Sequence, residues 1–437
     1  MLELEEILLK TTEDSLSLEK LVESENVERV DNDIIFKNIN FGDVKIDLSN
    51  NLIFSKSNLN IGFFQIGNKY LNEENQKFNY KKLIFCECKI NSLIFSGSTN
   101  LELSIEKCEI NELKFFNIFY SQRQGEISPN SVKNFEITKS TIKLLDIKKC
   151  KFAGKFYINP QNRNYSDSKC INEIKIIDST FEKNFKLHNV VNEKFEIDNV
   201  DFNANADFYK SKFLSKGREC IVFNGINFKK LALFGDTEFH MKLIFQYVTF
   251  ESHNHFKSCL LKNGIDLEYT NIQKEINFYG IVLKNVDNTS QETYRIIKSQ
   301  FDKLGNRIEA NLYHSYELEQ RNRNLSYFSP NKWALIIHKY SSYYSQYWLL
   351  PLFWILVVSY LTNLYLDYEK FNFLTNLFNW NLNELKIELK DLIKYSSIVN
   401  FDKSFSEEHV EAFVFNKISL GYLYYQLVTA VRKDTRK

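Results

Sequence analysis

Apolar residues recur at short, regular intervals through the first part of the chain. Between residues 83 and 115 they fall at alternating steps of two and three, and the pattern repeats every ten residues. These positions are Leu83, Phe85, Cys88, Ile90, Leu93, Phe95, Leu103, Ile105, Cys108, Ile110, Leu113 and Phe115. A helix has a period of 3.6 residues and a half-buried strand a period of two, so neither gives this spacing. The pattern predicts a chain that turns a corner about every five residues.

The same rhythm returns further along the chain with a period of 21 residues. It is seen in the pairs Ile174 and Phe195, Ile176 and Ile197, Ser179 and Val200, and Phe181 and Phe202, and weaker copies end at Ile272. Four five-residue faces make a coil of about 20 residues, and such coils stack so that each covers the apolar face of the next. We therefore expect a mainly β solenoid over residues 31–288, with an N-terminal cap over residues 1–30.

The five-residue unit resembles that of the pentapeptide-repeat proteins. The residues that carry the resemblance are the small inward ones, Cys88, Cys108 and Ser140, which suit a narrow interior. The resemblance implies a right-handed quadrilateral β-helix. Many copies carry Leu or Phe where the family prefers a small residue, so we expect wider or less regular coils.

The apolar spacing changes to steps of three and four after residue 289. Tyr294, Ile297, Phe301 and Leu304 are followed by Gly305 and Asn306, which are typical of a helix end, and a second stripe begins at Ile308. We expect a helical hairpin over residues 289–323, in a segment that continues with basic residues to residue 339.

A short string in this hairpin carries a second resemblance. It consists of Tyr294-Arg295, Lys298, Gly305-Asn306, Glu309-Ala310, Tyr313 and Glu317. The string is similar to the hairpin that joins pentapeptide solenoids to membrane segments in a group of bacterial membrane proteins. Arg295, Glu309 and Glu317 could form a catalytic or ligand-binding cluster, but a salt-bridged hinge is the better interpretation because surface ion pairs are common and weak.

Two apolar stretches follow in residues 340–437. Residues 340–366 contain no charge, and as a helix residues 348–366 would span about 28 Å, enough to cross a bilayer. The alternative is a buried core helix. The second stretch, residues 412–431, contains one charge, Lys417, and either spans the membrane or lies at its interface.

The distribution of charge predicts an orientation. Four basic residues and no acidic residue stand between residues 320 and 347, the connecting segment 367–411 has 5 Lys or Arg and 9 Asp or Glu (5 − 9 = −4), and the chain ends in Arg432-Lys433-Asp434-Thr435-Arg436-Lys437. Basic flanks face the cytoplasm, so we expect a two-pass protein of the bacterial inner membrane with both termini cytoplasmic and residues 367–411 outside. The seven cysteines lack metal-type or redox-type pairs and suit free thiols in a reducing cytoplasm. Leucines at residues 382, 385, 389 and 392 predict an amphipathic helix on the outer surface.

Polar residues mark the two membrane segments. The candidates for intramembrane polar contacts are Ser359, Asn363, Lys417, Ser419, Gln426 and Thr429. They could line an ion pathway in an assembly of several copies, or they could pair the two helices by hydrogen bonds, and the second interpretation is the simpler one.

Enzyme chemistry is weakly supported by the sequence. The nucleotide-binding, zinc-protease, serine-hydrolase and EF-hand motifs are absent, and His253, His255 and Cys259 lack a fourth ligand for zinc. Residues 81–285 have 30 basic and 24 acidic residues (30 − 24 = +6), which is the wrong sign for a DNA mimic. We expect no metal, no cofactor and no nucleic-acid partner.

These patterns together favour a non-enzymatic, membrane-anchored β-helix that acts as a cytoplasmic scaffold or sensor. Its partners would be the lipid bilayer and another protein, with homo-oligomers possible in principle. One alternative is a subunit of an oligomeric ion channel gated by the β-helix. Another is a soluble, topoisomerase-binding pentapeptide protein, which the charge of residues 81–285 disfavours.

Overall fold

The computed structural model describes residues 27–30, 33–37, 40–47, 51–55, 58–65, 81–96, 100–118, 122–123, 126–127, 131–160, 171–217, 219–366, 382–399 and 403–435. The chain forms two compact units, residues 1–293 and 294–437, which are described separately. Of the cap expected over residues 1–30, only Val27–Val30 (β1) lies in the described part, and it pairs antiparallel with β2.

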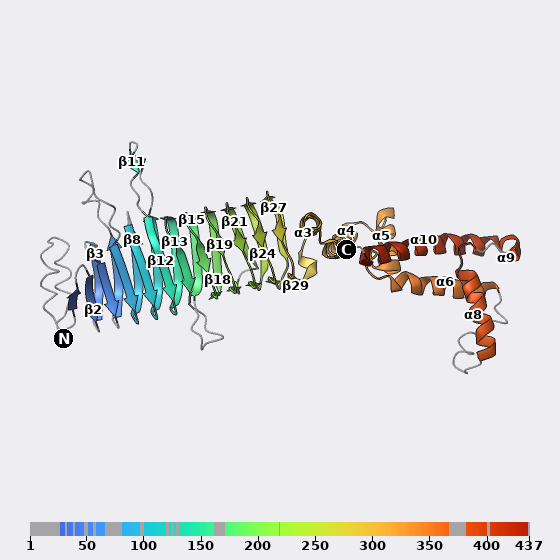
Figure 1. The fold of residues 1–437 in the computed structure, drawn as a ribbon, viewed down its shortest axis with the longest axis horizontal. Coiled ribbons are helices and arrows are strands. Elements are labelled where there is room, and N and C mark those ends of the chain that lie inside the picture. Colours follow the sequence, from blue (N-terminus) through green and yellow to red (C-terminus); the bar gives the residue numbers. More distant parts are fainter. Residues whose placement is uncertain are drawn as a thin grey trace. The chain divides into compact units, whose positions relative to one another are not determined.

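The first unit is a parallel β-solenoid, as the five-residue pattern predicts (Figure 1). One ladder consists of β2 (Asp33–Lys37), β4 (Asn51–Ser55), β6 (Lys81–Cys86), β8 (Asn100–Glu106), β12 (Ser131–Thr138), β14 (Phe156–Asn159), β16 (Phe185–Leu187), β19 (Ala206–Asp207), β22 (Ala232–Leu233), β25 (Asn254–His255) and β28 (Ile276–Asn277). A second ladder consists of β3 (Asn40–Asp47), β5 (Asn58–Gln65), β7 (Lys89–Ser96), β9 (Glu109–Ile118), β13 (Thr141–Phe152), β15 (Ile171–Phe181), β18 (Lys194–Phe202), β21 (Cys220–Phe228), β24 (Lys242–Phe250) and β27 (Ile265–Ile272). From residue 191 onward a third ladder joins β17 (Val191–Asn192), β20 (Lys212–Phe213), β23 (Glu238–Phe239), β26 (Leu260–Leu261) and β29 (Val282–Leu283), while β10 (Gln122–Arg123) and β11 (Glu126–Ile127) form a separate hairpin.

Left-handed residues make the corners inside the second ladder. Lys149, Asp178, Asn199, Gly225 and Tyr247 all have positive φ, between 50° and 62°, and successive strands align them with one another. This conformation changes the direction of the strand at the same place in each coil. The five-residue spacing seen in the sequence therefore has a backbone cause.

The side chain that follows such a left-handed residue points inward. When it is a serine, its hydroxyl accepts a hydrogen bond from a backbone N–H of the preceding coil. The Oγ of Ser179 accepts a hydrogen bond from the N–H of Cys150 in the preceding coil at 3.2 Å, and it donates to the carbonyl of Ile177 at 2.8 Å. The Oγ of Ser140 does the same for the N–H of Cys108 at 2.9 Å. The small inward residues thus satisfy buried backbone groups as well as fitting a narrow interior.

Columns of stacked phenylalanine fill the rest of the interior. One column contains Phe152, Phe181, Phe202, Phe228 and Phe250, whose ring centroids follow one another at 5.0, 5.3, 5.1 and 5.2 Å. Offset stacking at this spacing is favourable beyond the area that it buries. Because the coils rise by about 4.8 Å, one ring per coil fills the column, which explains why Phe is tolerated at these positions.

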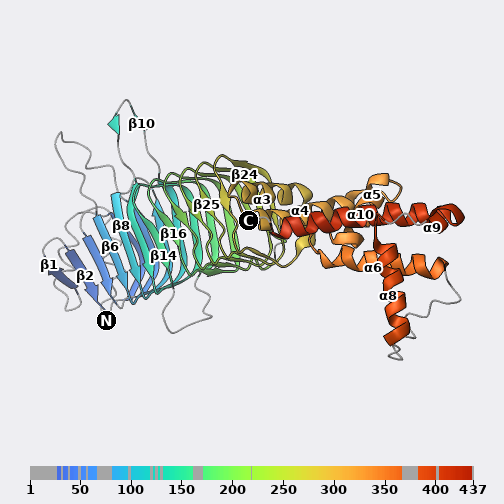
Figure 2. The same cartoon turned by 45° about the vertical axis from the view of Figure 1, so that its right-hand side comes forward.

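The second unit is helical. Its elements are α3 (Gln291–Lys303), which starts at the unit boundary, α4 (Arg307–Asn324), α5 (Pro330–Ser342), α6 (Leu349–Leu366), α8 (Leu382–Ser396), α9 (Lys403–Glu408) and α10 (Val410–Thr435). α3 and α4 form the predicted hairpin, joined through Gly305 at φ 75° and capped by the side chain of Asn306. α6 packs beside α10, and α8 contacts α6 and runs across the long axes of both helices (Figures 1 and 2).

α6 is the one helix in the described residues that is long and apolar enough to cross a membrane. Only 28% of its residues are buried. Ile355 of α6 and Leu420 and Leu423 of α10 form the small apolar contact between the two helices. The large apolar side chains on the outer faces of α6 and α10, such as Leu356 and Ile418, are exposed.

Candidate functional site

Polar side chains are concentrated where α6 meets α10. Asn416 of α10 is fully buried, and its Nδ2 donates hydrogen bonds to Oγ1 of Thr362 at 2.9 Å and to the carbonyl of Tyr395 at 3.2 Å. Ser359 and Asn363, which the sequence analysis selected on α6, are buried near the same contact. The hydroxyl of Ser359, Oδ1 of Asn416 and Nδ2 of Asn363 are buried without a hydrogen-bond partner. This group of polar side chains can hold α6, α8 and α10 together.

Three side chains of α10 bind the C-terminal end of α8. Besides Asn416, the Nζ of Lys417 donates to the carbonyl of Ser397 at 2.8 Å, and the hydroxyl of Tyr424 donates to the carbonyl of Ser396 at 3.2 Å. The last carbonyls of a helix lack internal partners and carry a partial negative charge, so a lysine is favourable there. The charge of Lys417 is therefore satisfied at the end of α8.

A second polar group fixes the turn between α5 and α6. The Oε1 of Gln426 accepts hydrogen bonds from the hydroxyls of Ser342 and Ser345, both at 3.0 Å. Tyr343, Tyr344 and Ser345 have φ of 48°, 59° and 63°, which is an unfavourable conformation for side chains of this size. The hydrogen bonds to Gln426 offset that cost, so α10 stabilises the turn.

Glu319 of α4 joins the same turn through charged contacts. Its carboxylate accepts from Nζ of Lys339 at 2.8 Å and from the hydroxyl of Tyr344 at 3.0 Å, while Nζ of Lys433 donates to the carbonyl of Tyr344 at 3.2 Å. Burial opposes ionisation of Glu319, but these donors outweigh it and hold its pKa below the usual value. Burial lowers the pKa of Lys433.

The other residues selected from the sequence take less central positions. Ser419 and Thr429 are half-buried on α10, whereas Gln426 is buried. Asn416 and Thr362 were not among the residues selected from the sequence, although Asn416 stands three residues before Ser419 and Thr362 three residues after Ser359, so both continue the polar spacing. Their contact joins residues 54 positions apart, and it is known only from the structure.

Charged residues also meet on the α3–α4 hairpin. Arg295 donates to Oε1 of Glu317 at 3.1 Å, and Nδ1 of His314 lies 3.2 Å from Oε2 of Glu317. Burial opposes ionisation of Glu317, but His314, Arg295 and Lys298 together hold its pKa below the usual value. Glu309, also considered for a cluster, lies in the first turn of α4, where its N–H is capped by Asn306. These contacts fit a salt-bridged hinge.

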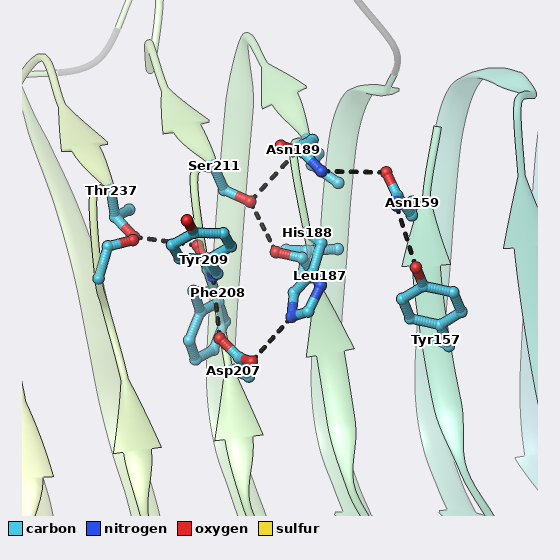
Figure 3. Close-up of polar contacts among 12 residues, drawn as sticks. Tyr157, Asn159, Leu187, His188, Asn189, Asp207, Phe208, Tyr209, Ser211 and Thr237 are labelled. Atoms are coloured by element: carbon cyan, nitrogen blue, oxygen red, sulfur yellow. Dashed lines mark hydrogen bonds and ion pairs between the residues drawn. The ribbon is translucent and has the colours of Figure 1, made fainter. Parts of the chain in front are cut away.

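Figure 3 shows one of the histidine–carboxylate pairs on the solenoid surface. Nε2 of His188 lies 2.8 Å from Oδ2 of Asp207, between the rings of Tyr157 and Tyr209. The nearby hydroxyl of Ser211 faces inward and donates a hydrogen bond to the carbonyl of Leu187 at 2.6 Å. The His188–Asp207 contact joins neighbouring coils.

The weak zinc candidate does not form a cluster. His253 lies 3.1 Å from Glu275, His255 is half-buried on β25, and Cys259 is fully buried inside the solenoid. No group of three or more His, Cys, Asp or Glu side chains suited to a metal is found among the described residues.

Comparison with known proteins gives no match for this chain, whether with protein-family models, with curated proteins or with solved structures.

Proposed function

We propose that this protein is a non-enzymatic, membrane-anchored β-solenoid that serves as a cytoplasmic scaffold or sensor for a protein partner. The helical unit would anchor the protein in the membrane, and the solenoid would provide the surface that binds the partner. The five-residue rhythm and the left-handed corners further support a degenerate pentapeptide-repeat helix with four faces per coil, in a bacterial protein.

The observation that carries the proposal is the reversed polarity of the α6–α10 pair. In a water-soluble protein the large apolar side chains face inward and the polar ones face solvent. Here Ser359, Thr362 and Asn416 are buried between the helices, while Leu356 and Ile418 are exposed on the outside. Lipid is the environment in which that arrangement is favourable, because polar groups then pair helices and apolar groups face the tails.

A two-pass arrangement follows from extending the same reasoning to α10. Its outer positions Val414, Phe415, Ile418, Tyr425 and Val428 are apolar and exposed. Lys417, the one charged residue between Glu411 and Arg432, donates to the carbonyl of Ser397 just past the end of α8, so it would lie with α8 at the outer surface and not in the hydrocarbon core. α8 crosses the pair and would lie along the outer membrane surface, with both chain termini on the cytoplasmic side.

The same contacts favour an anchor over an ion channel. A pore needs polar side chains that face a channel between subunits, whereas Asn416 and Gln426 are buried within one chain. The channel stays the alternative hypothesis, and conductance recordings on the purified protein in planar bilayers would reveal it.

Membrane fractionation with an alkaline carbonate wash tests the proposal. The full chain should stay in the pellet, and a truncation that ends at Ser329 should be released, because it lacks both apolar helices. A full-length control variant on the solenoid, Tyr247→Ser, should behave as the unaltered chain. Release of the full chain by carbonate would overturn the anchor.

A further inference from the structure

Helix α5, which precedes the proposed span, has an exposed apolar face of its own. Trp333, Ile337 and Tyr340 are 56%, 54% and 65% exposed, and their spacing of four and three residues places them on one side of the helix. The opposite side holds polar residues against the protein, among them the buried Lys332 and Ser342. α5 therefore has the same reversed polarity as the α6–α10 pair.

The chain turns sharply between α5 and α6. Nε1 of Trp354 donates a hydrogen bond to the carbonyl of Tyr340 at 2.8 Å. Fourteen residues of continuous helix would separate these groups by about 21 Å, so α5 cannot continue the axis of α6. The left-handed residues Tyr343–Ser345 make the turn, and Gln426 holds it.

The charges around α5 fit a membrane surface. Arg321 and Arg323 are exposed and precede α5 in a stretch, residues 320–366, that contains no Asp or Glu, whereas Lys332 is buried and Lys339 is paired with Glu319. Trp and Tyr are favoured at the headgroup level, where an apolar ring and a polar edge are both satisfied. Basic residues there are attracted to anionic lipids.

We infer that α5 lies in the plane of the lipid headgroups on the side of the membrane where α6 begins, with Trp333, Ile337 and Tyr340 facing the acyl chains. The inference rests on the proposed anchor and adds a lipid-binding surface to it. The occupant is the bilayer because the face is continuous, through the Trp354–Tyr340 contact, with the exposed apolar face of α6. α5 then sets the depth of the anchor and lets lipid composition act on α4 through the Lys339–Glu319 pair.

Depth-dependent quenching of tryptophan fluorescence tests the inference on the full chain in vesicles of phosphatidylcholine and phosphatidylglycerol. One variant keeps Trp333 alone, by Trp348→Phe, Trp354→Phe and Trp380→Phe. Two reference variants replace all four tryptophans by Phe and add Leu356→Trp, at the middle of α6, or Tyr247→Trp, on the solenoid.

Trp333 should be quenched about twofold more by shallow than by deep quenchers, because an in-plane helix is buried by only roughly 5–10 Å. Leu356→Trp should show the reverse order, and Tyr247→Trp should be quenched by neither. An unquenched Trp333 beside a quenched Leu356→Trp overturns the inference and leaves the anchor intact. If Leu356→Trp is also unquenched, the anchor falls as well.

Oxidative footprinting of the unaltered chain gives an independent check that needs no substitution. Trp333 and Tyr340 are exposed in the protein alone, so lipid should reduce their modification several-fold, while the exposed Tyr247 of the solenoid should be modified as before. Equal modification of Trp333, Tyr340 and Tyr247 in vesicles contradicts the in-plane position of α5.

Discussion

Single hydroxyls in the solenoid interior have a defined energetic role. Ser179→Ala removes the hydroxyl that accepts the hydrogen bond from the buried N–H of Cys150. We expect a loss of about 1–3 kcal/mol in the free energy of unfolding, measured by denaturant titration. Ser179→Cys is the matched control, because the Sγ of Cys108 already accepts from the N–H of Cys88 at 3.3 Å. Equal stability of the alanine and cysteine variants would contradict this role.

Two glycines with positive φ allow the cost of backbone strain to be measured apart from the cost of steric crowding. Gly217 has φ 79° and open space around it, whereas a Cβ at Gly264, with φ 87°, would lie 3.0 Å from the carbonyl carbon of Asn288. Gly217→Ala should cost about 1–2 kcal/mol from the left-handed conformation alone. Gly264→Ala should cost clearly more, seen as a larger drop in melting temperature. A smaller drop for Gly264→Ala would show that the end of the solenoid relaxes freely.

At the scale of elements, Gln426 connects α10 to the α5–α6 turn. Gln426→Leu removes the amide oxygen that accepts from the hydroxyls of Ser342 and Ser345, so contacts with His338 are left to hold these hydroxyls in the left-handed turn. We expect hydrogen exchange at residues 343–347 to become at least about tenfold faster, because a loss of about 1.4 kcal/mol corresponds to that factor. Thr429→Val, on the same helix, is the control and should leave this segment unchanged. Unaltered hydrogen exchange in the Gln426→Leu variant would show that α10 does not stabilise the turn.

The contact of α4 with α5 should depend on pH through Glu319. Its pKa is lower in the folded protein than in the unfolded chain, so the ionised form contributes stability above the unfolded pKa of about 4.3. That contribution is lost as pH falls through the folded pKa. Glu319→Gln should therefore be less stable than the unaltered chain at pH 7, by roughly 1–3 kcal/mol, and equally stable in strong acid. A difference that grows on acidification would reverse the assigned sign.

The sequence predicted elements better than their contacts. The α3–α4 hairpin and α8 follow from apolar residues three and four apart, and α6 follows from an uncharged apolar run. Both signals are local properties of the sequence. The binding of the α8 C-terminus by Asn416, Lys417 and Tyr424 joins residues 20 to 28 positions apart. Nor does any local signal indicate that Tyr343 and Tyr344 would adopt positive φ, because that conformation is imposed by contacts with Glu319 and Gln426.

At the scale of the whole molecule, the charge asymmetry predicts which segments are reached from outside the cell. Glu408→Cys, in the acidic segment, should react with a membrane-impermeant maleimide in intact cells. Ser326→Cys, in the basic segment before α5, should react only after permeabilisation. The half-buried native thiols of Cys86 and Cys220 belong to the solenoid and should stay unlabelled in intact cells. Labelling of Ser326→Cys alone in intact cells would invert the proposed topology.

The solenoid was predictable as a whole because its repeating unit appears directly in the sequence. Leu83, Leu93, Leu103 and Leu113 are all fully or almost fully buried, as their spacing indicates. The role of Ser140 and Ser179 as hydrogen-bond acceptors was not predictable from the same pattern. It depends on which N–H of the adjacent coil the left-handed corner leaves unpaired, and that is known only from the register.

Equivalent corners recur once per coil, so the length of the solenoid can change only in steps of one whole coil. Asp178 and Asn199 occupy equivalent corners 21 residues apart. Deletion of residues 178–198 would therefore join Ile177 to Asn199 and shorten the solenoid by one coil, about 4.8 Å. Excision of one residue more or fewer would turn every inward side chain beyond the junction toward solvent until the next corner. Such a chain can change its reach over evolution by gaining or losing whole coils without redesign of its interior.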